Sequence, residues 1–262
     1  ESITESLLQL DTKLDKYEKT EKEEYILIDV SNKDYFDKIV QKNKIIEIID
    51  HHIGFESYWK QRLQEKAHIE FIGAVATILV ERYEKVNLLD KMSHDVAYLL
   101  MCGILDNTLN LKAKITTSRD INAYKKLETI IGNGKNYSEK YFLECQKGIE
   151  NDLIAAIQND TKIEEINQII PHIFSQLTVW DKTNILKNRT VIYDAMQKFG
   201  KDWIMNLICL KEGKSYILSN NEEIKKNIEN LMGNTFDNDI MTLPEMWLRK
   251  EIIKKSFLIL NQ

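Results

Sequence analysis

An aspartate and two adjacent histidines follow a short apolar run near the middle of the first hundred residues. The run covers residues 45–49 and leads directly into Asp50, His51 and His52. A carboxylate and imidazoles held close together can bind a divalent metal ion or carry out acid–base chemistry. In the plainer interpretation, Asp50 caps the next helix and the histidines are partly buried polar residues. Burying three titratable groups in succession without a metal or anion partner is costly, so we favour a functional site.

Two more carboxylates lie where they could complete such a site. Asp29 ends the apolar run 25–28, and Asp106 follows the apolar segment 96–105. Mixed carboxylate and imidazole ligands suit Mn²⁺, Zn²⁺ or Fe²⁺. A helix cap for Asp29 and a turn residue for Asp106 are the plainer interpretations of these two positions.

The elements that carry these residues predict a parallel sheet. The runs 25–29 and 45–49 read as strands that alternate with helical segments, which is the pattern of a parallel sheet. Ligands of such sheets bind beyond the carboxyl ends of the strands. Asp29 and Asp50 both fall at such ends, so their positions indicate a site before any family is considered.

The rest of the chain reads as helices in the first half and mixed elements in the second. In the first half, apolar spacing predicts a weak helical pattern over 5–24 and helices over 34–41, 73–86, 94–106 and 117–132. In the second half, it predicts helix over 136–170, strands over 190–196, 203–210 and 215–219 with a hairpin turn at 212–214, and a helix over 221–233. We therefore expect two α/β domains with a helical connection around 145–175.

The composition excludes several classes of protein. The formal net charge is −5 over 262 residues, which gives no case for a nucleic-acid or membrane-surface binder. No apolar run approaches the ~20 residues that a membrane span needs. Cys102, Cys145 and Cys209 lie far apart in the sequence, which suggests reduced thiols and a cytoplasmic location.

Several stretches resemble motifs of the DHH phosphoesterase superfamily. "ILIDVSN" (26–32) and "IIEIIDHH" (45–52) resemble its second and third motifs. "EFIGAVATILVERYEK" (70–85) resembles its Gly-x-x-Ala-Thr helix, and "LLMCGILDNTLNLKAKITTSRD" (99–120) resembles its fourth motif. "WDK" (180–182) and "LRK" (248–250) are similar to the DHHA2 domain that accompanies family II (manganese-dependent) inorganic pyrophosphatases, exopolyphosphatases and prune-like proteins. The resemblance covers residues 25–132 and 178–256.

The resemblance implies a role for each residue of the first-domain site. Asp29 matches a carboxylate that bridges two metals, and His51 and Asp106 match metal ligands. His52 matches a contact to substrate phosphate, while Asp50 is expected to orient the site rather than bind metal.

The resemblance also implies phosphate ligands in the second half of the chain. Lys182, Arg249 and Lys250 match basic residues that bind phosphate oxygens. Arginine presents a fork that suits phosphate, and lysine supplies a point charge. Read without the resemblance, Arg249 and Lys250 would be a solvated face near a helix end.

The fold implied is α/β, with a parallel-sheet DHH domain over 1–160 and a smaller α/β DHHA2 domain over 161–262. The implied cofactor is Mn²⁺ (or Mg²⁺ or Co²⁺), with two ions when the family's first motif is present. The implied partner is a small phosphate-anhydride substrate, with no nucleic acid and no membrane, and a homodimer is the oligomer to test.

The sequence departs from the family pattern at three motifs. The first motif, a strand followed by a histidine and two aspartates, is not found before residue 25, and because the chain starts at Glu1 we expect it upstream. The second motif reads Asp-Val-Ser-Asn at 29–32, the fourth reads Asp-Asn-Thr at 106–108, and Glu251 follows the basic pair. These differences keep polyphosphate beside pyrophosphate as the expected substrate.

The expected function is metal-dependent hydrolysis of phosphoanhydride bonds in pyrophosphate or polyphosphate, with water activated by two metal ions. One alternative is a non-catalytic phosphate-binding or interaction module that has lost the first motif. Another is a DHH-type phosphodiesterase acting on short oligonucleotides or cyclic dinucleotides. That branch carries a Gly-Gly-Gly-His segment, and this sequence has no Gly-Gly pair.

Overall fold

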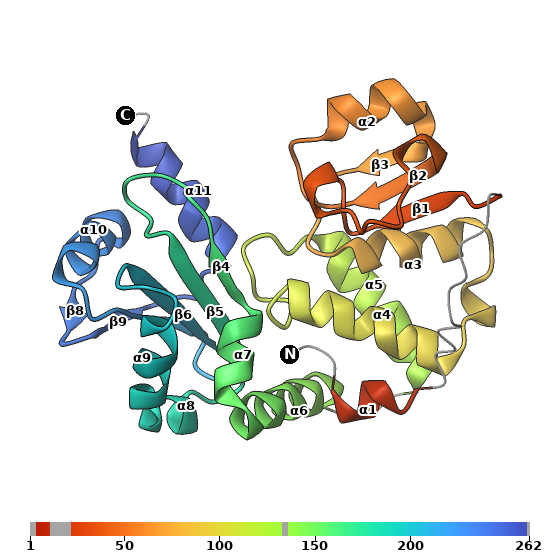
Figure 1. The fold of residues 1–262 in the computed structure, drawn as a ribbon. Helices are drawn as coiled ribbons and strands as arrows, with labels where there is room; N and C mark the ends of the chain where they lie inside the picture. Colours follow the sequence, from red (N-terminus) through yellow and green to blue (C-terminus); the bar gives the residue numbers. More distant parts are fainter. Residues whose placement is uncertain (1–3, 11–21, 133–135, 261–262) are drawn as a thin grey trace. The chain divides into compact units, whose positions relative to one another are not determined.

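The computed structural model describes residues 4–10, 22–132 and 136–260 (Figure 1). Its contacts divide the chain into two compact units. The N-terminal unit comprises residues 9–135, and the C-terminal unit comprises residues 136–262 together with residues 1–8. The boundary that we predicted after residue 160 falls inside the C-terminal unit.

A three-stranded parallel sheet forms the centre of the N-terminal unit. Its strands β1 (Tyr25–Ile28), β2 (Ile45–Asp50) and β3 (Ala67–Ile69) lie in the order β1-β2-β3, and both pairings are parallel. The parallel sheet and the two predicted strands are confirmed, while β3 was not predicted. Because β2 is central, its carboxyl end is flanked by the ends of both neighbours.

Helices cover both faces of this sheet (Figure 1). On one face, Trp59 of α2 (Glu56–Leu63) packs into an apolar cluster with Leu27 and Ile48. On the other face, Val75 and Ile78 of α3 (Val75–Lys85) pack against Ile49 of β2. Helices α4 (His94–Asn107) and α5 (Ser118–Ile131) pack against each other and against α3. The three helices predicted over 73–132 are therefore confirmed.

The helix predicted over 34–41 is wrong. Only the short 3₁₀ helix η1 (Lys33–Tyr35) forms there. Asn32 caps it by accepting from the N–H of Asp34, and the Asp37 carboxylate accepts from the N–H of Ile39. These local side-chain hydrogen bonds compete with a helix and favour turns. Of the pattern predicted over 5–24, α1 (Glu5–Leu8) is a helix, and residues 11–21 lie outside the described residues.

The C-terminal unit is built on a mixed six-stranded sheet, whose order is β4-β5-β6-β7-β9-β8. Its strands are β4 (Thr161–Ile163), β5 (Ile173–Val179), β6 (Trp203–Cys209), β7 (Lys214–Leu218), β8 (Phe236–Asp237) and β9 (Ile240–Leu243). Strands β5 and β6 are parallel, and the other pairings are antiparallel. The hairpin predicted from strands over 203–210 and 215–219 is confirmed as β6 and β7.

Two separate apolar cores lie on the two faces of this second sheet. One contains residues of α6 (Tyr137–Asn151), α7 (Leu153–Asn159), α8 (Thr183–Lys187) and α9 (Arg189–Gln197). The other contains residues of α10 (Glu222–Met232) and α11 (Arg249–Leu260). Helix α10 ends as predicted at Gly233, which adopts a left-handed conformation with φ 72°. The α/β class predicted for the chain is confirmed.

The strand predicted over 190–196 is wrong, because these residues belong to α9. Ile192, Ala195 and Met196 are buried at helical spacing. One buried stripe of this kind suits a helix lying on a sheet, and it outweighs the β preference of Thr190, Val191 and Ile192.

Among the described residues, no helix is both long and apolar enough to cross a membrane.

Candidate metal centre

Asp29 is held at the end of β1 by a left-handed backbone conformation. Its φ is 65°, which aspartate tolerates better than most residues with a side chain. Its N–H donates to the carbonyl of Ile49 at 2.9 Å, which ties this turn to the end of β2. The carboxylate is then 3.2 Å from Nε2 of His51, so the ends of the two neighbouring strands bring these two side chains together.

The imidazole of His51 is buried and has a defined orientation. Its side chain is 2% exposed, and Nδ1 lies 3.2 Å from the carbonyl oxygen of Ile72. A carbonyl oxygen only accepts hydrogen bonds, so Nδ1 must carry the proton. In the neutral imidazole, the lone pair of Nε2 then faces Asp29. Two acceptor atoms 3.2 Å apart repel unless a proton or a metal ion stands between them.

Asp50 organises the turn that follows β2. It is fully buried, and its Oδ1 accepts from the N–H of His51 at 2.7 Å, from the N–H of His52 at 3.1 Å and from Nδ1 of His52 at 2.7 Å. Burial raises the pKa of Asp50, but hydrogen bonds, chiefly from His52, outweigh it and the net pKa is lowered. Asp50 is therefore an ionised carboxylate that fixes both histidines.

Asp29, His51 and His52 together make a set of ligands suited to a metal ion. One potential ligand atom from each lies within 4.8 Å of the others. Two imidazoles with one carboxylate suit Mn²⁺, Fe²⁺ or Zn²⁺. His51 has its second nitrogen held by a backbone carbonyl, which is the usual arrangement of a metal-binding histidine. The residues present thus fit a divalent metal.

Asp106, the other predicted metal ligand, belongs to α4. It is half-buried in the last turn of α4 and does not belong to the cluster of Asp29, His51 and His52. Its role as a metal ligand stays a prediction.

A second buried carboxylate, Asp120, was not singled out by the sequence. It is fully buried at the start of α5, and it accepts hydrogen bonds from Gly73, Ala74, Thr77 and Thr117. The sequence did signal the cap: Thr117 and Asp120 form a capping box. The sequence did not indicate the contacts between Asp120 and residues 73–77, because these residues lie more than forty positions before Asp120.

The predicted phosphate ligands belong to the C-terminal unit, where Lys182 and Arg249 are engaged in ion pairs. Lys182 pairs with Glu212, and its Nζ lies 5.0 Å from the centre of the Tyr216 ring. Arg249 is 14% exposed and pairs with Asp160 at 2.6 Å.

Arg249 also donates to two main-chain carbonyls, those of Asp160 and Phe174. These contacts hold Arg249 within its own unit. Lys250 follows it in the first turn of α11. Phosphate binding by Lys182, Arg249 and Lys250 stays a prediction.

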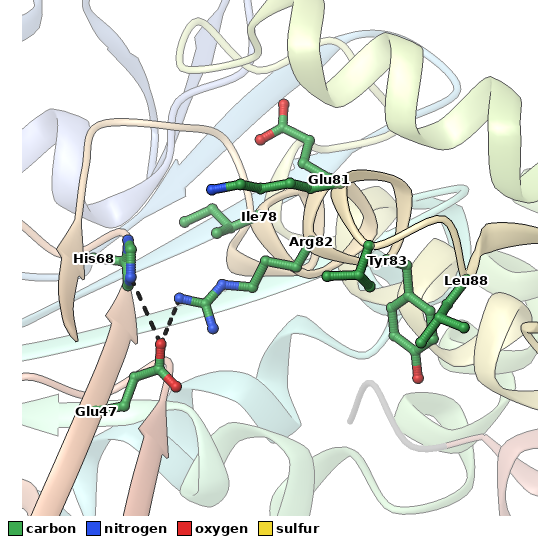
Figure 2. A pocket seen from close by; sticks show the side chains of 9 residues that line it. Glu47, His68, Ile78, Glu81, Arg82, Tyr83 and Leu88 are labelled. Carbon is green, nitrogen blue, oxygen red and sulfur yellow. Dashed lines mark hydrogen bonds and ion pairs between the residues drawn. The ribbon is translucent and has the colours of Figure 1, made fainter. Parts of the chain in front are cut away.

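A pocket of about 670 Å³ is lined by residues of β2, β3, α3 and the turn after α3 (Figure 2). Among the lining residues, Glu47 of β2 lies 2.7 Å from Arg82 and 3.6 Å from His68. Its acidic and basic groups thus offset one another, and none of Asp29, His51 and His52 lines it.

Comparisons with known proteins identify relatives among the inorganic pyrophosphatases. No family profile matches the chain. The manganese-dependent inorganic pyrophosphatase of Bacillus subtilis (strain 168) is 31% identical over 109 residues, which are 41% of this chain and 33% of that protein. The protein of the same name from Methanocaldococcus jannaschii is 27% identical over 223 residues, which cover 77% of this chain and 69% of that protein.

A solved structure shares the fold. It is a crystal structure of a Methanococcus jannaschii protein assigned to the family II inorganic pyrophosphatases, with a TM-score of 0.66 at 21% identity. The alignment covers 91% of this chain and 82% of that chain. The expected resemblance to manganese-dependent, family II inorganic pyrophosphatases is confirmed.

Proposed function

We propose that this protein is a metal-dependent hydrolase of phosphoanhydride bonds that acts on inorganic pyrophosphate or short polyphosphate. The observation that carries the proposal is the pair of potential ligand atoms Asp29 Oδ1 and His51 Nε2, which lie 3.2 Å apart at the carboxyl ends of two parallel strands. A divalent cation would be bound by both atoms in place of a proton on Nε2. The names of the sequence relatives support Mn²⁺ as that cation and pyrophosphate as a substrate.

The position of each residue in the site indicates whether it binds metal or contacts phosphate. Asp29 and His51 would hold the metal, because their ligand atoms converge and the proton of His51 is already on Nδ1. When bound, divalent ions supply a nucleophilic water at neutral pH and neutralise charge on the attacked phosphate. His52 is 57% exposed, and its Nδ1–H is held by Asp50. In the doubly protonated ring, its Nε2–H is then the group that can donate to a phosphate oxygen.

The buried carboxylate of Asp50 orients the site without facing the substrate. It accepts from both histidine N–H groups and from the His52 ring, and it is shielded from solvent. This arrangement keeps His52 at the edge of the centre while His51 stays inside it. A bound anion would then meet one buried and one exposed imidazole.

The test is phosphate release by the natural, full-length protein. Pyrophosphate and tripolyphosphate are each supplied with Mn²⁺, and His51→Gln is compared with His68→Gln. His68 is a matched control, because it also contacts a carboxylate, Glu47, but it lies outside the cluster. We expect release that depends on Mn²⁺, is lost in His51→Gln and is kept in His68→Gln.

Other results of this assay would contradict the proposal or identify the preferred substrate. Absence of release from both substrates, or an unchanged rate in His51→Gln, would contradict the proposal. Absence of release with Mn²⁺ still bound would favour a phosphate-binding module instead. The ratio of the rates on the two substrates assigns the protein to pyrophosphate or to polyphosphate.

A further inference from the structure

We propose that Asp120 is a positioning residue of the metal centre, which acts on His51 through the loop between β3 and α3. This inference rests on the proposed function only in taking His51 as a metal ligand. Asp120 touches neither metal nor substrate in this scheme. Its effect passes through two backbone amides and one backbone carbonyl.

The first step is the set of hydrogen bonds that Asp120 accepts from the loop and from α3. Its Oδ2 accepts from the N–H of Gly73 at 3.1 Å, and its Oδ1 accepts from the N–H of Ala74 at 3.2 Å. The hydroxyl of Thr77 donates to Oδ1 at 2.6 Å. A capping box needs only the reciprocal contacts with Thr117, so the contacts with residues 73–77 serve something else.

The second step is the close approach that a glycine allows. A Cβ built on Gly73 would lie 2.6 Å from Oδ2 of Asp120 and 2.8 Å from Cγ2 of Thr108. Only a residue without a side chain lets the backbone come so near to the carboxylate. The loop is therefore shaped around Asp120.

The third step is the other end of the loop. The N–H of Glu70 donates to the carbonyl of Asp50 at 3.2 Å, and the Glu70 carboxylate binds Arg119 at 2.6 and 2.9 Å. Arg119 precedes Asp120 in α5, so adjacent residues of one helix hold both ends of the loop.

The last step joins the loop to the metal centre. Ile72 lies between the two anchors, it is 2% exposed, and its carbonyl accepts from Nδ1 of His51 at 3.2 Å. That bond sets which nitrogen of His51 carries the proton. If the amides of Gly73 and Ala74 lose their acceptor, the carbonyl moves and His51 is free to take its other tautomer.

The test is Asp120→Asn, read by the tautomer of His51 in metal-free protein and by Mn²⁺ affinity. An asparagine cannot accept at both positions, so one group of donors loses its partner. The ¹⁵N shifts of the five histidine rings report the tautomers, and His51→Gln assigns the His51 signals. We expect a single Nδ1–H form in the native protein, both tautomers in Asp120→Asn, and a dissociation constant for Mn²⁺ raised by about 10–100-fold.

Two further variants keep the inference falsifiable. Thr77→Val removes one hydrogen bond to Asp120 with little change of shape, and it should shift the same signals with a smaller loss of affinity. It replaces Asp120→Asn as the deciding variant if that protein does not fold. Ile131→Ala weakens the far end of α5 without touching the loop, and it should leave tautomer and affinity unchanged.

Unchanged His51 signals and affinity in the deciding variant would overturn the inference. An equal loss in Ile131→Ala would overturn it too, since Asp120 would then act only through stability. The tautomer is read without substrate. A protein that fails to release phosphate but shows this dependence contradicts the proposed function and leaves the positioning role standing.

Discussion

At the scale of single residues, the structure explains how Asp29 and His51 bring two potential ligand atoms of a cation together. Nδ1 of His51 donates to a backbone carbonyl, so in the neutral ring Nε2 can only accept, and the Asp29 carboxylate can only accept as well. Asp50 differs from Asp29, because its Oδ1 accepts hydrogen bonds from His51 and His52 while its Oδ2 is buried without a hydrogen-bond partner among the described residues. Asp29 is thus a candidate metal ligand, whereas Asp50 orients the two histidines.

The backbone of Asp29 leads to the first prediction. Asparagine tolerates the left-handed conformation, whereas alanine strains it at a cost of about 1–2 kcal/mol. Both changes remove the carboxylate that faces His51, so we expect Asp29→Ala to have a free energy of unfolding lower than that of Asp29→Asn by that amount, as measured by urea unfolding without metal. Equal stability of the two variants would show that the turn does not constrain this position.

At the scale of elements, one buried carboxylate links α5 to α3 and to the loop before α3. Asp120 accepts from the first residues of α3 and from the loop before it, and it also caps its own helix. A fully buried carboxylate is costly unless each oxygen is satisfied, and both oxygens of Asp120 are. The junction of the two helices is therefore sensitive to shape.

The second prediction tests that sensitivity with a pair of glycines. Gly73→Ala forces a methyl group against Asp120 and Thr108, so we expect a loss of about 1–3 kcal/mol. Gly148→Ala is the matched control, because it lies in the exposed interior of α6 with no atom near the new methyl group. It should gain about 0.5–1 kcal/mol from helix propensity. Chemical unfolding that ranks the two variants the other way would refute this packing.

The third prediction concerns the dependence of stability on pH. Arg119 binds Glu70 and Glu81, and its hydrogen bond lowers the pKa of Glu70 below the ordinary value of 4.5. A lowered pKa gives stability that is present above pH 4.5 and is lost as the pH falls through the value in the folded protein. These side chains are partly exposed, so Arg119→Met should cost no more than about 1 kcal/mol at pH 7.

Urea unfolding of the native protein and Arg119→Met at pH 7, 5 and 3 checks the contribution of Arg119 to stability. The difference between the native protein and Arg119→Met should shrink below pH 4.5 and disappear at lower pH. A difference that stays constant down to pH 3 would mean that Arg119 stabilises by packing alone.

The sequence predicted the elements with strong and simple patterns. Helix α5 was found from its cap at Thr117 and its stop at Gly132, and β2 from its apolar run. Strand β3 was missed because its three residues, Ala67–Ile69, are too short for alternation to show. The β-branched residues at the start of α9 led to the wrong prediction of a strand, because burial of one helical face against the sheet outweighs their β preference.

The candidate site was predictable to the extent that chain neighbours compose it. Asp50, His51 and His52 are consecutive, and Asp29 shares their sheet edge, so strand ends were enough to group them. The link from Asp120 to His51 was not predictable. It depends on main-chain carbonyls and amides of Ile72, Gly73 and Ala74, and apart from the glycine these groups do not determine the residue type.

At the scale of the whole molecule, each unit has a sheet and cores of its own. The N-terminal unit holds the cluster and its supporting loop, while the C-terminal unit buries two apolar cores on the faces of its mixed sheet. A ligand that binds only the folded form of one unit should stabilise that unit first.

The fourth prediction follows from that division. Mn²⁺ at 100 times its dissociation constant should raise the free energy of opening by about 2.7 kcal/mol. In hydrogen exchange, we expect the gain at the slow amides of β2 and α3 and no comparable gain at those of β5 and β6. Equal gains in both units, or a gain confined to β5 and β6, would place the metal elsewhere.

Direct titration of the natural, full-length protein with Mn²⁺ by calorimetry is the sharpest test of the metal centre. Native protein and His68→Gln should bind with the same affinity. His51→Gln should bind more weakly by more than the roughly 10–100-fold that loss of a supporting hydrogen bond costs. Equal affinity in all three proteins, or no binding by the native protein, would contradict a metal centre at Asp29 and His51.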